Sequence, residues 1–138
     1  MIVLDTNVIS EVFKPAPDPR LLAWAHRQDD AQVVTTAITR GELLYGLNIM
    51  AQGKRRDLLM AGLRHVFDVR FANRVLPFDD SAADVYALIL AERRRMGRPI
   101  GVADAMIAGI ARSRGARLAT RNVRDFEGCG IALIDPWQ

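Results

Sequence analysis

Four acidic residues, Asp5, Glu42, Asp104 and Asp125, stand where a predicted strand gives way to a turn or where a predicted helix begins. If these chain ends converge, they form a pocket of oxygen donors without cysteine or histidine, which suits Mg2+ or Mn2+ better than Zn2+. A metal ion in such a pocket lowers the pKa of a bound water, orients that water for attack and neutralises charge on a phosphate. The residue types therefore predict a metal-dependent nuclease.

Each acidic residue also has an ordinary structural explanation. Glu42 could close a capping box with Thr39, and Asp104 stands three residues after a possible helix cap at Gly101, where an acid favours the helix dipole. The other two acidic residues could belong to turns. A cap needs no partner at the same sheet edge, so four acidic residues predicted at one edge favour the functional explanation.

The elements that must position these carboxylates are predicted from the apolar pattern of the chain. Strands are predicted at 2–4, 33–37, 75–78, 117–120 and 131–134, and helices in a segment ending at residue 13, around 21–24, and at 42–50, 55–71, 81–96 and 102–114. Strands separated by whole helices require crossover connections, which predicts an α/β fold with a mostly parallel sheet covered on both faces. Ligands bind such sheets at the carboxyl ends of the strands, where all four acidic residues are expected.

Length and composition limit the class of protein. A chain of 138 residues, half of them hydrophobic, predicts one domain spanning residues 1–138. No apolar stretch approaches the roughly 20 residues of a membrane helix, and no signal peptide is recognisable, so we expect a cytoplasmic protein. Cys129 is the only cysteine, which excludes an intrachain disulfide and a cysteine-rich zinc site. His26 and His65 are 39 residues apart and are expected to be ordinary surface or interhelical residues.

The cations are almost all arginine. Seventeen arginines stand against two lysines, and the net charge is +3. Arginine suits phosphate recognition, although a GC-rich genome would give the same bias, and both explanations stay open. Nine arginines but only two acidic residues lie between residues 92 and 124. The candidates for contacts with an RNA backbone are Arg93, Arg94, Arg98, Arg121 and Arg124, although the run at 93–95 turns around a helix, so at least one of its members is expected to be merely solvated.

Five segments together carry a resemblance to a known family. They are MIVLDTN at 1–7, ELLYG at 42–46, RPIGVAD at 98–104, TRNVRDF at 120–126 and DPW at 135–137. In order and spacing they resemble the PIN-domain nucleases, and among these the VapC toxins of type II toxin–antitoxin systems, of the FitB-like kind. The resemblance spans essentially the whole chain and depends on the ordered set, because DTN alone is a weak signal.

The resemblance implies a PIN-like three-layer α/β/α sandwich and a Mg2+-dependent endoribonuclease, with Mn2+ able to substitute. Asp5 and Asp104 would be the main metal ligands, and Glu42 and Asp125 would complete the site directly or through water. Supporting polar residues would be Thr6, Asn7, Thr120 and Asn122. Cleavage would leave a 5′-phosphate and a 3′-hydroxyl. Many relatives carry a serine at the position of Gly101, so the helix cap here is expected to be weaker by a few tenths of a kcal/mol.

The resemblance also implies partners. These are an RNA substrate that is single-stranded or looped, a second copy of the chain, and a VapB-like or FitA-like antitoxin in a toxin–antitoxin hetero-oligomer. The basic tail of the antitoxin would occupy a groove leading to the acidic pocket. The apolar residues Leu58, Leu59, Met60 and Leu63 could serve such an interface, and ordinary core packing explains them equally well.

Two other functions are weighed against the nuclease. A phosphoaspartate receiver domain needs a second early acidic residue and a lysine near the phosphate, but Asn7 stands in place of that acid and the only lysines are Lys14 and Lys54. A catalytically silent PIN-like module would bind RNA or a partner without cutting, but silent relatives usually lose part of the acidic quartet. A nuclease assay with and without EDTA separates the silent module from the enzyme.

Overall fold

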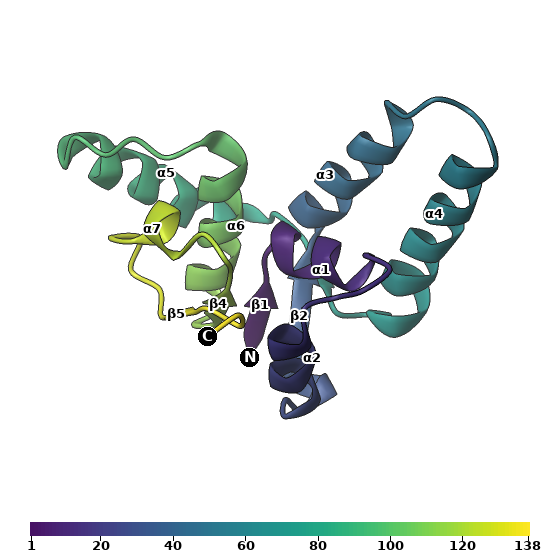
Figure 1. Ribbon diagram of the computed structural model, residues 1–138. Coiled ribbons are helices and arrows are strands. Elements are labelled where there is room, and N and C mark those ends of the chain that lie inside the picture. The colour runs from purple at the N-terminus through teal and green to yellow at the C-terminus, as the bar shows by residue number, and fades with distance from the viewer.

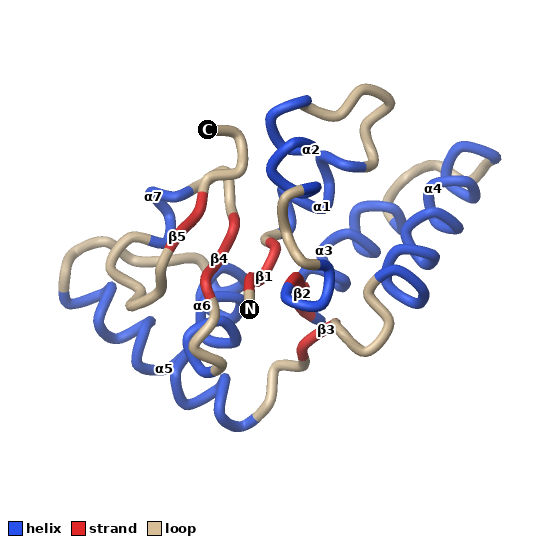
Figure 2. The backbone as a smooth tube through the Cα atoms, turned by 90° about the horizontal axis from the view of Figure 1, so that it is seen from below, coloured by secondary structure: helices blue, strands red, loops and turns tan.

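The computed structural model describes all 138 residues and is built on a five-stranded sheet. The strands are β1 (Ile2–Leu4), β2 (Val33–Thr36), β3 (Val75–Leu76), β4 (Arg117–Ala119) and β5 (Leu133–Ile134). Their order is β3-β2-β1-β4-β5, and every neighbouring pair is parallel (Figure 2). The predicted parallel α/β sheet is therefore confirmed.

Seven α-helices connect these strands. They are α1 (Thr6–Val12), α2 (Pro19–His26), α3 (Ala37–Asn48), α4 (Lys54–His65), α5 (Asp80–Arg95), α6 (Val102–Ser113) and α7 (Val123–Phe126). Helices α3 and α4 run side by side away from the sheet as an arm, whereas α5, α6 and α7 lie on the other side of the molecule (Figure 1). No helix is long and apolar enough to cross a membrane.

Side chains from β1 show why both faces of the sheet are covered. Successive strand residues point to opposite faces. Val3 belongs to the core cluster that includes Ile89 of α5 and Ile107 of α6. Ile2 and Leu4 instead belong to the cluster that contains residues of α1 and α2. Helices thus pack on both faces, which confirms the predicted three-layer arrangement.

The start of α3 differs from the prediction of a helix at 42–50 and a strand extending to residue 37. The helix begins at Ala37 because the Thr36 side chain is its N-cap and accepts a hydrogen bond from the Thr39 N–H at 3.1 Å. Thr39 is therefore inside the helix, and the capping box proposed for Thr39 and Glu42 does not form. Glu42 lies in the second turn of α3, so helix capping does not explain an acidic residue at this position.

Other boundaries were missed for local reasons. The predicted helix at 55–71 is α4 followed by a short π-helix at Val66–Arg70. Strand β3 ends at Leu76, before Pro77, which has no N–H to continue the ladder. The four-residue helix α7 was not predicted at all. Helices α5 and α6 end as expected before Gly97 and Gly115, which have positive φ of 72° and 62°.

Candidate active site at the carboxyl edge of the sheet

Asp5 is fixed at the end of the central strand. Its N–H bonds the carbonyl of Ala119 at 2.9 Å, which continues the pairing of β1 with β4. Its carboxylate caps α1 by accepting from the Thr6 N–H at 2.8 Å, and its second oxygen accepts from the Thr120 hydroxyl at 2.7 Å. Only 4% of Asp5 is exposed. The fold thus holds a buried carboxylate at the carboxyl edge of the sheet.

The pKa of Asp5 is raised above its ordinary value of 3.8. Burial is the largest cause, since it penalises the charged form, and the hydrogen bonds from Thr120 and Thr6 oppose it. The negative charges of Glu42 and Asp125 raise the pKa further. Asp5 is therefore close enough to both of these predicted site residues to be affected by their charges.

A hydroxyl of α1 links Glu42 to the same edge. The Thr6 hydroxyl donates to Glu42 Oε1 at 2.7 Å and lies 3.0 Å from the hydroxyl of Thr39. Because Thr6 has a single hydroxyl proton and gives it to Glu42, Thr39 must be the donor in the second contact. From the sequence, Thr39 was considered only as a cap partner of Glu42 and not as a site residue, although its position one helical turn before Glu42 was a usable signal.

The remaining polar residues tie β4 to α1. The Asn7 amide donates to Asp5 Oδ2 at 3.3 Å and to the Thr120 hydroxyl at 3.4 Å, and its carbonyl accepts from the Arg121 N–H at 3.3 Å. Thr120 also accepts from the Asn122 N–H at 3.0 Å. Asn122 thus contributes through its backbone, and its side chain makes no cap bond for α7. The structure brings Thr6, Asn7, Thr120 and Asn122 into one network around Asp5.

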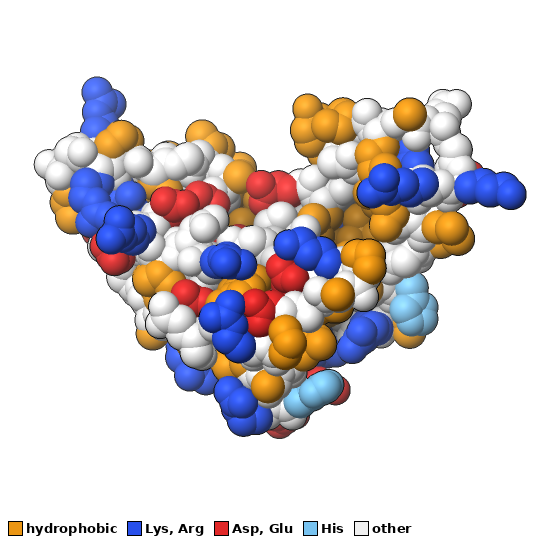
Figure 3. Space-filling view, viewed as in Figure 1, with side chains coloured by type: hydrophobic (Ala, Val, Ile, Leu, Met, Phe, Trp, Pro, Cys, Tyr) orange, Lys and Arg blue, Asp and Glu red, His pale blue; other side chains and the backbone are white.

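Asp104 lies in the first turn of α6, after the N-cap at Gly101, which offers no side-chain cap bond. The pKa of its half-buried carboxyl is raised to about 6. Burial is the largest cause, followed by the negative charges of Asp5, Asp125 and Glu42, while the positive charge of Arg93 opposes them. The charges of the other three predicted carboxylates therefore all act on Asp104. Acidic side chains are visible on the hollowed face between the α3–α4 arm and the opposite side of the molecule (Figure 3).

The donor chemistry of this edge fits a partly hydrated Mg2+ ion. No three acidic, histidine or cysteine side chains lie close enough together to form a complete metal cage. Mg2+ does not require one, because it commonly keeps several waters and is held by one or two carboxylates together with substrate phosphates. Burial and mutual repulsion already raise the pKa of Asp5 and Asp104, and a cation would relieve that repulsion.

The five candidate arginines fall into two groups. Arg94, Arg98, Arg121 and Arg124 are exposed. Arg121 lies over the ring of Trp137, with 4.9 Å between its guanidinium carbon and the ring centroid. Arg121 and Arg124 also line a polar hollow of about 430 Å³ beside Asp125. Arg93 is instead only 4% exposed, and its guanidinium donates to main-chain carbonyls, so the structure gives it an internal role rather than the predicted contact with RNA.

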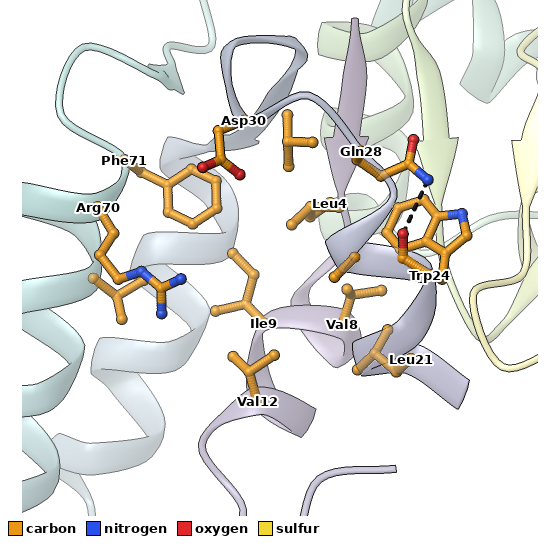
Figure 4. Close-up of a pocket in the computed structure, with 13 residues that line it drawn as sticks. Leu4, Val8, Ile9, Val12, Leu21, Trp24, Gln28, Asp30, Arg70 and Phe71 are labelled. Atoms are coloured by element: carbon orange, nitrogen blue, oxygen red, sulfur yellow. Dashed lines mark hydrogen bonds between the residues drawn. The ribbon is translucent and has the colours of Figure 1, made fainter. Parts of the chain in front are cut away.

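An apolar cavity of about 130 Å³ lies away from the acidic edge, among α1, α2, β2 and the π-helix (Figure 4). Leu4, Ile9, Leu21 and Phe71 are among its lining residues, and Gln28 beside it donates to the carbonyl of Trp24 at 3.0 Å. None of the four carboxylates reaches this cavity. The acidic edge is therefore the candidate active site.

A parallel sheet in an α/β fold, with carboxylates as the acidic groups at its carboxyl edge, agrees with the class of fold that the sequence motifs indicated. The family model for the PIN domain matches residues 2–128, and the chain belongs to the PIN-domain family.

Curated relatives match over nearly the full length. The chain is 44% identical over 138 residues to the protein named VapC ribonuclease Y4jK of Sinorhizobium fredii, covering all of this chain and 99% of that relative. It is 37% identical to the protein named Toxin FitB of Neisseria gonorrhoeae, covering 99% of each. A solved structure of FitAB bound to an IR36 DNA fragment matches with a TM-score of 0.93 and 36% identity, covering all of this chain and 96% of that chain. The resemblance to VapC and FitB toxins is confirmed.

Proposed function

We propose that this protein is a Mg2+-dependent endoribonuclease and the toxin of a VapBC-type toxin–antitoxin pair. The observation that carries the proposal is the placement of the four carboxylates at one sheet edge, where Thr6 bonds both Asp5 and Glu42, and where Asp104 and Asp125 line one hollow. Support comes from a full-length relative that is named a ribonuclease and another that is named a toxin. The reaction is hydrolysis of an RNA phosphodiester bond, with Mn2+ able to replace Mg2+.

Asp5 and Asp104 would hold the ion, with Glu42 and Asp125 acting directly or through water. The bound ion supplies an activated water and neutralises charge on the phosphate. The protein contributes the orientation of the donors. Thr120 and the Thr6 N–H fix both oxygens of Asp5, and the Thr6 hydroxyl fixes Glu42. Each fixed carboxylate oxygen keeps further lone pairs for a ligand.

The exposed arginines near this edge would contact the RNA backbone. Arg121 and Arg124 line the hollow that contains Asp125, and Arg94 and Arg98 are exposed near the end of α5. Arginine binds phosphate through a planar fork of donors, so these residues would hold the strand across the acidic edge.

The proposed partners are an antitoxin of the VapB or FitA kind and a second copy of this chain, in the cytoplasm. The antitoxin proposal is supported by the structure of FitAB, whose chain matches this one over its full length.

Of the apolar residues considered for an interface, Leu63 is 3% exposed and packs internally, whereas Leu58 is 74% exposed. Tyr45 and Ile49 on the same α3–α4 arm are 66% and 68% exposed. Light scattering after size exclusion tests the homodimer, and a strict monomer at tens of micromolar would contradict it.

The decisive experiment is cleavage of a mixed set of labelled RNAs by purified, antitoxin-free protein. Discrete cuts are expected in Mg2+ or Mn2+, and they should vanish with EDTA and in the Asp104→Asn variant. Full activity of Asp104→Asn at saturating Mg2+ would exclude the assigned ligand. Metal binding without any cutting across the set would indicate a narrow substrate outside the set, whereas a folded protein that neither cuts RNA nor binds the metal would favour the silent RNA-binding or partner-binding module.

A further inference from the structure

One arginine is buried beside the acidic edge and has no acidic partner. Arg93, in the last turn of α5, is 4% exposed and takes part in none of the ion pairs of the structure. A buried charge is costly unless its donors are satisfied. Arg93 satisfies them on the main chain: Nε donates to the carbonyl of Arg98 at 2.6 Å, and Nη1 donates to the carbonyls of Asp125 at 2.7 Å and Glu127 at 3.1 Å.

These three carbonyls belong to the two segments that carry half of the acidic quartet. Arg98 begins the loop that enters α6 through Gly101 and leads to Asp104. The other two carbonyls lie at the end of α7, which carries Asp125. A helix of four residues is not stable alone, and its last carbonyls have no partners within the helix. The Arg93 guanidinium supplies a partner for two of the carbonyls at this helix end, those of Asp125 and Glu127, as cationic side chains often do.

The chain that Arg93 binds also packs against the arginine stem and its neighbour Met96. Gly128 has a positive φ of 79°, and a Cβ at this position would lie 2.7 Å from Met96 Cε and 3.8 Å from Arg93 Cδ. The segment after α7 therefore packs closely against Met96 and lies in van der Waals contact with the arginine stem. Arg93 also lines the same hollow of about 210 Å³ as Asp104 and Asp125. Arg93 thus lies beside both acidic segments at this hollow.

We propose that Arg93 is a positioning residue of the active site, which sets the separation of Asp104 and Asp125 by binding the main chain next to both. This inference rests on the proposed nuclease function. Because Arg93 is 4% exposed and donates to three carbonyls, we assign it no contact with the RNA or the reacting atoms. Its guanidinium binds three carbonyls of two segments at once, and a lysine ammonium, which lacks the planar fork, cannot reproduce that geometry.

The test compares Arg93→Met, which keeps the apolar stem, and Arg93→Lys, which keeps the charge, with Ile89→Val. Ile89 is fully buried one helical turn earlier on α5, so its truncation controls for a general loss of stability. All variants are assayed below their melting temperatures. At saturating Mg2+, kcat of Arg93→Met should fall about tenfold or more while KM changes little, because small displacements of catalytic groups are costly. Arg93→Lys should be intermediate and Ile89→Val should match the wild type.

Mn2+ binding, measured by calorimetry without RNA, provides the second readout. Affinity should fall severalfold in Arg93→Met and stay unchanged in Ile89→Val. If Arg93→Lys and Arg93→Met both keep the kcat and the Mn2+ affinity of the wild type, the inference is wrong. If Arg93→Met does not fold, the result for Arg93→Lys decides alone. A wild-type protein that cuts no RNA would refute the proposed function, whereas a selective loss of Mn2+ affinity in the Arg93 variants would still support positioning.

Discussion

Replacing Asp104 by asparagine should stabilise the metal-free protein at neutral pH. The pKa of this carboxyl is raised from 3.8 to about 6, so the folded state binds the proton more tightly than the unfolded state does. At about 1.4 kcal/mol per pKa unit, the ionised carboxylate would cost about 3 kcal/mol above pH 6. The side chain is partly exposed, and solvent screening reduces the expected cost to about 1.5 kcal/mol.

The raised pKa of Asp104 also determines how the stabilisation by Asp104→Asn depends on pH. A carboxyl with a raised folded-state pKa destabilises the protein progressively as the pH rises from about 4 to about 6, and the cost is constant above that range. Asp104→Asn removes the charge, so its advantage over the wild type should be largest above pH 6 and should disappear near pH 4. For a domain of this size the gain corresponds to roughly 5 °C in Tm at pH 7.5.

The assay is thermal unfolding in EDTA at several pH values. Asp84→Asn is the matched control because Asp84 is an exposed carboxylate on α5 without a hydrogen-bond partner, and its Tm should follow the wild type at each pH. Added Mg2+ should raise the Tm of the wild type more than that of Asp104→Asn, since the cation offsets the same repulsion. A Tm of Asp104→Asn at or below that of the wild type at pH 7.5, or a difference independent of pH, would refute the reasoning.

Three further predictions concern packing, capping and charge. Gly109→Ala should destabilise the protein by about 1–3 kcal/mol because its Cβ would lie 2.8 Å from the Ala82 carbonyl, whereas Gly46→Ala, with open space inside α3, should stabilise it by about 0.5–1 kcal/mol. Urea unfolding measures both, and equal signs would contradict the packing argument. Thr36→Ala should cost about 1 kcal/mol through loss of the α3 cap, and an unchanged urea midpoint would contradict that assignment. RNA affinity should fall steeply with salt if the exposed arginines bind phosphate, and a flat response would exclude them.

The sequence predicted the sheet and its carboxyl edge because the pattern extends over many residues. Apolar runs separated by amphipathic segments require crossovers, and the limits of those runs place Asp5 at a strand end and Asp104 at a helix start. The α3 cap was not predictable in the same way. Thr36 and Thr39 are equally good N-caps by type, and the choice depends on the pairing of Thr36 with Leu76 in β3, which keeps Thr36 extended.

Tertiary contacts also determine the features that the sequence pattern did not reveal. Arg93, Arg94 and Arg95 are identical in type and consecutive, so only packing shows that the first of them turns inward. Helix α7 has four residues and is too short for a periodic signal. It is held instead by the buried ring of Phe126 and by the hydrogen bonds from Arg93.

The two halves of the acidic quartet are held in physically different ways. Asp5 and Glu42 are fixed through their own carboxylates, which accept hydrogen bonds from Thr120 and Thr6. The segments that carry Asp104 and Asp125 are held through the main chain, which leaves both carboxylates without hydrogen bonds. A substitution of Asp5 therefore disturbs the polar network and the charge together, since an asparagine keeps only one of the two acceptor oxygens. Asp104→Asn removes the charge alone, so a loss of cleavage in that variant reports on the chemistry of the site rather than on its folding.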